Sequence, residues 1–292
     1  MTTDEGMTDE QRWEAYLWPS DEGPGRTMLR NLYGLHNIDE LRRREYRETA
    51  KRALEIRRGQ VDIARTGDLR EWQAIHAHLF GNVYEWAGQL RDVVLGKGLR
   101  TFLAPELFDA YIPSMLDGVR AIPWSSLDRL PFIELTAQVY AALNWAHPFR
   151  EGNGRAARLF LDRQIESAEW KLDYGRIEPH RWNAASEEAR PALYGMPSHY
   201  PLLPVFAQIT VHRRATVLSL DPVDPRDLEA VLARYRHTPG HETGEAIAAA
   251  GLDNTTLPST AIDTDTGIDS VPPSPGQQPS RNSSPPSADA TD

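Results

Sequence analysis

One short segment of the chain gathers the side chains that phosphate chemistry requires. Residues 147–158 read His-Pro-Phe-Arg-Glu-Gly-Asn-Gly-Arg-Ala-Ala-Arg. The segment therefore contains an imidazole base, a carboxylate, two glycines around an asparagine, and two arginines spaced three residues apart. These groups are sufficient to hold a nucleoside triphosphate and to activate a hydroxyl group beside it.

The second half of the segment is suited to bind phosphate groups. Gly152 and Gly154 allow backbone amides to approach an anion closely. A helix that begins near Arg155 would direct its first N–H groups and its positive dipole end to the same point. Arg155 and Arg158 would lie on one face of that helix, where they could grip successive phosphates.

The first half supplies a base and a metal ligand. A buried helix that runs to Ala146 would carry His147 at its C-terminal end, and Pro148 would stop it. An imidazole has an ordinary pKa of about 6.5, so it can accept a proton from a hydroxyl near neutral pH. Glu151 suits a Mg²⁺ ion that also binds phosphate oxygens.

Helices must position this segment, since hydrophobic residues recur at helical spacing through most of the first half of the chain. We expect helices over 39–59, 68–80, 104–119 and 131–146. Strand-forming residues at 90–95, a turn at 96–98 and a return over 99–103 predict one β-hairpin. The expected fold class is mainly α with one small hairpin.

Composition limits the setting of the protein. The chain has 292 residues, a formal net charge of −10 and no cysteine. This charge offers no general attraction for nucleic acid or an anionic membrane, and no stretch of about 18 apolar residues occurs. We therefore expect a cytoplasmic protein that binds neither a membrane nor nucleic acid directly.

The chain divides into four parts by composition. We expect a flexible N-terminus over 1–9, a catalytic domain over 10–215, a short helical extension over 216–252 and a disordered tail over 253–292. The tail is rich in Pro, Ser, Thr and Asp and has no aromatic residue, so it cannot bury enough apolar surface to offset its ordering entropy.

The segment 147–158 resembles the signature of the Fic (Fido) family, His-x-Phe-x-(Asp/Glu)-Gly-Asn-Gly-Arg-x-x-Arg, at every specified position. A looser resemblance runs from Trp18 to Val211 and includes 31–34, 75–80 and 86–91. The resemblance implies a Fic-type helical domain with a β-hairpin flap beside the active site.

The resemblance also implies a reaction, the transfer of AMP from ATP to a Ser, Thr or Tyr hydroxyl of a target protein. His147 would be the base and Glu151 the Mg²⁺ ligand. The nucleotide would be bound by Gly152, Asn153 and Gly154 as an anion hole, by Arg155 at the β-phosphate and by Arg158 at the γ-phosphate. The flap over 94–103 would pair with an extended target segment, with Lys97 and Phe102 as edge contacts.

Several alternatives stay open. Fic relatives that act as kinases carry Lys where Gly154 stands, which favours AMP transfer here, and a relative that transfers phosphocholine has a similar motif. A further alternative is that the protein is not an enzyme but a catalytically silent binding module with the same fold. We assign no function to His76 and His78, and we interpret the run 42–45 as a solvated helix face.

Regulation is predicted from a missing motif. Fic adenylyltransferases are commonly inhibited by a helix with the pattern Ser/Thr-x-x-x-Glu-Gly/Asn, and no segment of this chain fits it. We therefore expect a separate small antitoxin whose glutamate contacts Arg158, in a toxin–antitoxin pair. By the same resemblance a type II topoisomerase subunit is a candidate target.

Overall fold

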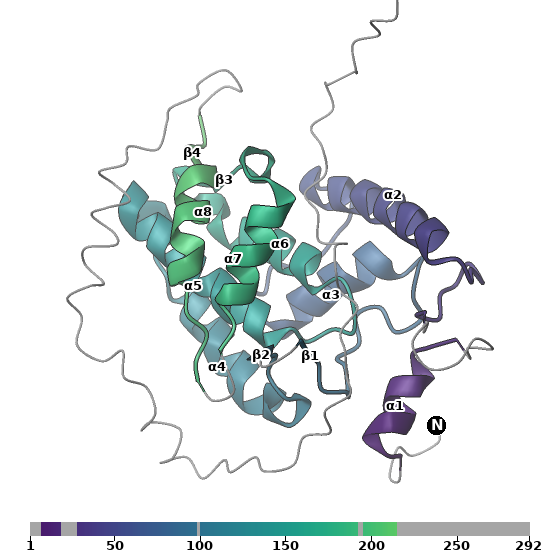
Figure 1. Cartoon of the computed structure of the whole chain (residues 1–292). Coiled ribbons are helices and arrows are strands. Elements are labelled where there is room, and N and C mark those ends of the chain that lie inside the picture. Colours follow the sequence, from purple (N-terminus) through teal and green to yellow (C-terminus); the bar gives the residue numbers. More distant parts are fainter. Residues whose placement is uncertain (1–6, 19–27, 98–99, 192–194, 215–292) are drawn as a thin grey trace, which may run out of the picture.

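The structure, a computed structural model, describes residues 7–18, 28–97, 100–191 and 195–214. Residues 1–6 of the expected N-terminus, the extension over 216–252 and the tail over 253–292 lie outside the described residues. Helices make up most of the described part, as predicted, and two small antiparallel sheets accompany them (Figure 1). No helix in the described ranges is long and apolar enough to cross a membrane.

The elements follow one another in a simple order. The helices are α1 (Asp9–Ala15), α2 (Ile38–Arg57), α3 (Leu69–Phe80), α4 (Phe108–Arg120), α5 (Arg129–Ala146), α6 (Asn153–Gln164), α7 (Pro179–Glu188) and α8 (Leu203–Ile209). The strands are β1 (Gly96–Lys97), β2 (Arg100–Thr101), β3 (Trp170–Leu172) and β4 (Thr210–His212). Short 3₁₀ turns lie at Pro105–Leu107, Trp124–Ser126, Ile165–Ser167, Tyr174–Arg176 and Tyr200–Leu202.

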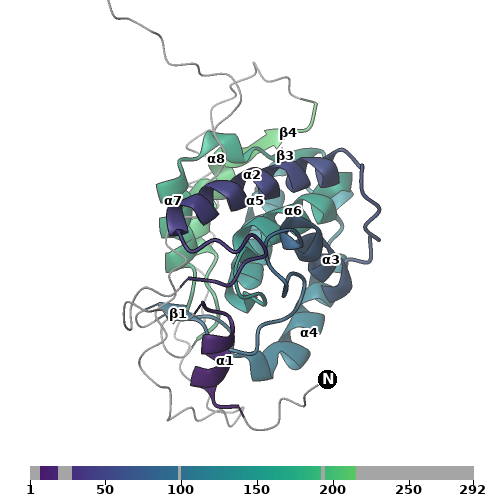
Figure 2. The same cartoon turned by 90° about the vertical axis from the view of Figure 1, so that its right-hand side faces the viewer.

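The core forms around α5 and α6. Helix α6 packs on both α3 and α5, while α2 contacts α3 and crosses the outside of the bundle (Figure 2). Because α4, α6 and α8 all contact α5, half of its residues are buried and it has no wide polar face. This arrangement holds the end of α5 and the start of α6, which flank the motif, within a well-packed interior.

Local capping signals set the helix boundaries close to the predicted ones. The Asn37 side chain accepts a hydrogen bond from the Glu40 N–H at the start of α2, and Asp68 accepts from the Arg70 N–H at the start of α3. Helix α6 begins at Asn153, two residues earlier than predicted, because Gly152 adopts a left-handed conformation with φ of 80° and forms its N-cap.

The hairpin exists, but its strands differ from the prediction. The paired residues are Gly96 with Thr101 and Lys97 with Arg100, so two residues of the predicted turn belong to the first strand. Residues 90–95 form no strand because this segment is tied to the end of α5: the Arg91 N–H donates to the Pro148 carbonyl at 2.8 Å.

Candidate active site

The predicted base lies at a sharp backbone turn. Helix α5 ends at Ala146, and His147 takes a left-handed conformation with φ of 41°, the single non-glycine residue of positive φ in the described part of the chain. Its ring Nδ1 is 3.1 Å from the carbonyl oxygen of Asn144. A carbonyl only accepts, so Nδ1 carries the proton and Nε2 is the basic nitrogen.

The flap covers this base. The rings of Phe102 and His147 stack with centroids 3.6 Å apart and planes 21° apart, and the guanidinium of Arg190 lies 4.5 Å from the other face of Phe102. His147 is only 3% exposed. Phe102 was predicted to contact a target at the flap edge, but it is buried with Val93 and Leu95. Phe102 therefore covers one face of the imidazole.

The loop after the base requires glycine at position 152. A Cβ added there would lie 2.1 Å from Cζ of Phe80, and φ of 80° also disfavours any side chain. The first hydrogen bond of α6 runs from the Ala156 N–H to the Gly152 carbonyl. The N–H groups of Asn153 and Gly154 precede that bond, so the start of α6 offers the predicted cradle for an anion.

The side chain of Asn153 does not line this cradle. Its Oδ1 accepts from the Phe149 N–H at 2.8 Å, and its Nδ2 donates to the Phe149 carbonyl at 2.7 Å. This pair of bonds closes the loop, and Phe149 anchors it in the core with 0% exposure. The amide of Asn153 thus shapes the loop, which leaves its backbone N–H for the predicted anion hole.

His76 is a site residue that the sequence analysis left without a function. The Gly88 N–H donates to Nδ1 at 2.8 Å, so Nε2 carries the proton and donates to the Glu151 carbonyl at 2.8 Å. Its ring stacks on Phe149 with centroids 3.9 Å apart. Complete burial lowers the pKa of His76 to about 3, so the imidazole stays neutral. His76 therefore fixes the position of the motif loop.

Arg155, the predicted ligand of the β-phosphate, already contacts three side chains. Its Nη2 lies 2.7 Å from Oε1 of Glu45 and 3.3 Å from Oε1 of Glu151, and Nη1 donates to the Thr49 hydroxyl. The guanidinium thus lies between α2 and the carboxylate of the motif loop. Glu45 is fully buried and also accepts from the Tyr84 hydroxyl, so the interpretation of 42–45 as a solvated face is wrong at this residue.

Arg158 has the environment of a phosphate ligand. It is 6% exposed, and its Nη1 has no hydrogen-bond partner among the described residues. The guanidinium lies 5.4 Å from the ring of Trp182 and 5.9 Å from that of Tyr174. A buried cation with an unsatisfied donor is costly unless a ligand completes its contacts.

Glu151 is the one motif carboxylate, and its side chain is 6% exposed. No group of three or more His, Asp or Glu side chains that could hold a metal occurs in the described ranges. A hard oxygen donor at the start of α6 still fits Mg²⁺, since that ion is often held by one carboxylate together with substrate oxygens. Glu151 fits this requirement only when a phosphate supplies the other ligands.

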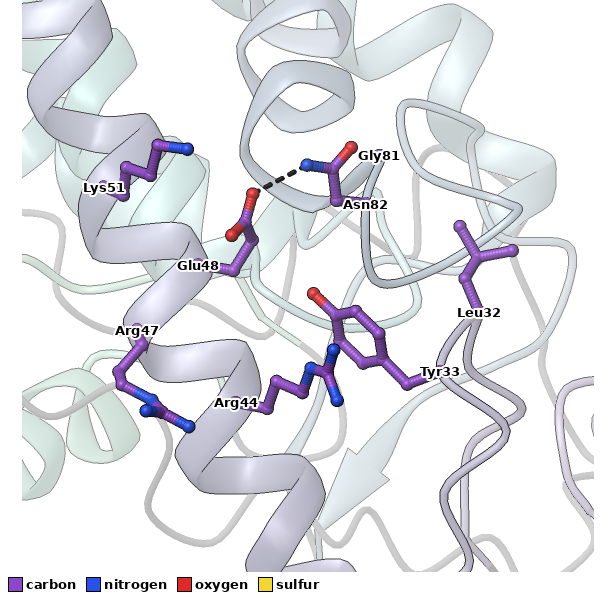
Figure 3. Close-up of a pocket in the computed structure, with 8 residues that line it drawn as sticks. All are labelled: Leu32, Tyr33, Arg44, Arg47, Glu48, Lys51, Gly81 and Asn82. Atoms are coloured by element: carbon purple, nitrogen blue, oxygen red, sulfur yellow. Dashed lines mark hydrogen bonds between the residues drawn. The ribbon is translucent and has the colours of Figure 1, made fainter.

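Two further features lie apart from the motif. The side chain of Lys97 is outside the described part of the chain, so its predicted contact with a target stays a prediction. A groove of about 740 Å³ lies along α2 (Figure 3). It is lined by Leu32, Tyr33, Arg44, Arg47, Glu48, Lys51, Gly81 and Asn82. None of these is a motif residue, so this groove is separate from the candidate active site.

The sequence matches a family of known proteins in the region that contains the motif. The model of the Fic/DOC family matches residues 67–165, which include α3, the flap and the whole motif. "Probable protein adenylyltransferase y4lH" of Sinorhizobium fredii is 32% identical over 164 residues, which cover 54% of this chain and 81% of that protein. The chain belongs to the Fic/DOC family.

A second relative is longer. The protein adenylyltransferase VbhT of Bartonella schoenbuchensis is 32% identical over 167 residues, or 57% of this chain, and the matched region is only 34% of VbhT. The names of these relatives identify the Fic family members as nucleotidyltransferases.

Solved structures share the fold. The BepC protein of Bartonella tribocorum, solved with bound AMPPNP, superposes with a TM-score of 0.59 and 27% identity over 69% of this chain and 98% of that one. A Fic domain from Bartonella quintana with bound ADP gives the same TM-score and identity and covers 96% of its own chain. The helical Fic fold predicted from the motif is confirmed.

Proposed function

We propose that this Fic protein transfers AMP from Mg·ATP to a Ser, Thr or Tyr hydroxyl of a target protein and releases pyrophosphate. One observation carries the proposal: the basic Nε2 of His147, the start of α6 and the unsatisfied Nη1 of Arg158 belong to one continuous segment of 12 residues. A base, an amide cradle and a phosphate-binding cation are the groups that nucleotidyl transfer requires.

The proposed nucleotide contacts lie at the start of α6 and at Arg158. The backbone amides of Asn153 and Gly154 bind the α- and β-phosphates at the positive end of the α6 dipole. Arg158 donates to the γ-phosphate, which satisfies its buried Nη1. Arg155 acts indirectly, since its contacts with Glu45 and Glu151 hold the start of α6 against α2.

The proposed transfer moves one proton, forms one P–O bond and breaks another. The target hydroxyl loses its proton to Nε2 of His147, and its oxygen attacks the α-phosphorus of ATP. The bond from that phosphorus to the bridging oxygen of the β-phosphate breaks, and pyrophosphate leaves. Glu151 is the residue that would hold Mg²⁺, and the ion would supply neutralisation of phosphate charge.

The donor is inferred from two facts. Gly154 stands where kinase relatives carry Lys, and Fic structures of other proteins hold AMPPNP or ADP. The two runner-up activities are phosphorylation and phosphocholine transfer. A silent module is the third alternative, and the cover of Phe102 over His147 is the observation that favours it.

The experiment uses ATP labelled at the α-phosphate, Mg²⁺ and a cell lysate. We expect label on a protein band with the wild type and none with His147→Ala, which should still bind ATP. His180→Ala removes an exposed histidine on α7 and should label normally. Transfer only from γ-labelled ATP would indicate a kinase, and transfer only from CDP-choline would indicate a phosphocholine transferase. Nucleotide binding without any transfer would indicate a silent module.

We further propose that the protein is the toxin of a toxin–antitoxin pair that acts in the cytoplasm. Because no inhibitory motif occurs in the chain, a small antitoxin would place its glutamate at Arg158, and type II topoisomerase subunits are the first targets to test. A full-length chain that is inactive until residues 215–292 are removed would contradict a separate inhibitor. Label on proteins other than a topoisomerase would replace the proposed target.

A further inference from the structure

Arg91 is a buried arginine in the segment that leads into the flap, and it is 2% exposed. All three of its nitrogens donate to backbone carbonyls. Nε donates to His147 at 2.7 Å, Nη2 donates to Leu103 at 2.6 Å, and Nη1 donates to Val93. Arg91 therefore contacts the residue that carries the base and the segments on both sides of the hairpin.

These carbonyls belong to two parts of the molecule that transfer chemistry must align. Val93 directly precedes the flap over 94–103 and Leu103 is its last residue, so β1 and β2 lie between them. His147 is the base. A guanidinium is planar and presents its donors in a rigid fork, so bonds to all three carbonyls fix the flap relative to the base.

The backbone supports the same connection. The Arg91 N–H donates to the Pro148 carbonyl at 2.8 Å, and the Leu103 N–H donates to the Trp145 carbonyl at 2.9 Å. Carbonyls at the C-terminal end of a helix have no intrahelical partner, and a cation is favourable there. Arg91 thus joins the end of α5 to both ends of the flap.

We propose that Arg91 is a positioning residue for the transfer reaction: it sets the flap, and with it the target strand, at the correct place relative to Nε2 of His147. This inference rests on the proposed function and names the residue that couples the target site to the base. The hydrogen bonds of Arg91 given above go to the flap and to the end of α5, so we expect the binding of ATP not to depend on it.

The test compares Arg91→Met and Arg91→Lys with Arg213→Met. Met keeps the apolar part of the side chain and removes the donors, while Lys keeps the charge but cannot present the fork. Arg213 is a matched control in hydrogen bonding, since it donates to the carbonyls of Ala168, Ile165 and Trp170 far from the flap, although it lies at the surface.

The first readout does not require activity. Hydrogen exchange at the Phe102 and Leu103 amides, whose acceptors are Leu95 and Trp145, should become faster in both Arg91 variants and stay unchanged in Arg213→Met. Modification of His147 by diethyl pyrocarbonate should become faster as well, because Phe102 no longer stays over the ring. Unchanged exchange and unchanged reactivity in a folded Arg91 variant would overturn the proposal.

The second readout is transfer to the lysate protein that the wild type labels. We expect a loss of roughly 10²-fold in the labelling rate for Arg91→Met, the size found when reacting groups are slightly misplaced, with the apparent KM for ATP unchanged. A parallel loss of ATP binding would contradict a positioning role. If Arg91→Met does not fold, Arg91→Lys carries both readouts. A wild type without transfer would refute the proposed function, while the exchange experiment would still decide the role of Arg91.

Discussion

Oε1 of Glu45 on α2 and Nη2 of Arg155 on α6 lie 2.7 Å apart, and the carboxylate is completely buried. The ion pair therefore joins an outer helix to the first turn of the helix that would bind phosphates. A buried charge left without its partner is strongly destabilising. The position of the α6 start thus depends on an acid more than a hundred residues earlier in the chain.

Replacing Glu45 with Gln should lower the free energy of unfolding by about 3 kcal/mol, because the buried guanidinium loses a charged partner. Urea unfolding followed by circular dichroism measures the change. Glu48→Gln is the control on the same helix, where the side chain is 21% exposed and pairs with Arg52. That change should cost less than about 1 kcal/mol. Equal losses in the two variants would show that the Glu45 pair contributes no special stability.

Gly152→Ala should be more damaging than Gly34→Ala. Both glycines have positive φ, 80° and 63°, but only Gly152 faces a side chain within 4 Å, the ring of Phe80. We expect a loss of about 1–2 kcal/mol for Gly34→Ala from the backbone alone. Gly152→Ala should lose an additional 1–3 kcal/mol or so from overpacking. Thermal unfolding distinguishes the two, and a Gly152 variant no weaker than the Gly34 variant would contradict the close approach.

The neutral state of His76 predicts a pH dependence of stability. Its pKa is lowered from 6.5 to about 3 by burial, so between these values the unfolded chain binds a proton that the folded protein does not. Stability is therefore lost as the pH falls from about 6.5 toward 3, by up to about 1.4 kcal/mol per pH unit. Urea unfolding at pH 7, 6 and 5 should show a shallower slope for His76→Gln. Parallel curves for the two proteins would refute the assignment.

Arg158 and Arg155 should respond in opposite ways to replacement by Met. Arg158→Met removes a buried cation whose Nη1 has no partner in the described part of the chain, so stability should change by less than about 1 kcal/mol or increase. ATP affinity should fall roughly tenfold to a hundredfold, as expected for a charge-assisted bond to phosphate. Arg155→Met should destabilise the protein, with a smaller effect on ATP affinity. Calorimetry measures the ATP affinity of each variant, and urea unfolding measures its stability. The reverse pattern would make Arg155 the phosphate ligand and Arg158 the structural residue.

Local signals explain what the sequence predicted well. Some residues determine where a nearby helix begins or ends, so helix positions and the motif could be inferred without a structure. They are Asp68 before α3, Pro148 after α5 and Gly152 before α6. The partner of Arg155 could not, because Glu45 looks like one more charge on an exposed helix. Only the packing of α2 on α3 turns Glu45 inward.

The strand positions of the flap could not be predicted from local sequence, because its strands are very short. The flap ladder has two residues in each strand, so strand propensity in 90–95 could not fix its register. His76 lies on the buried face of α3, and its role depends on two backbone groups, at Gly88 and Glu151, that are remote in sequence. No short stretch of sequence indicates either the register of the flap strands or the two hydrogen bonds of His76.

The aromatic cover over His147 affects what the enzyme does while no target is bound. Water is a nucleophile that could consume ATP whenever the imidazole is open to solvent, and His147, with Phe102 stacked on one face of its ring, is only 3% exposed. We therefore expect the stacked phenyl group to slow the hydrolysis of ATP while no target is bound. Phe102→Ala should accordingly release AMP from ATP faster than the wild type in the absence of any protein substrate.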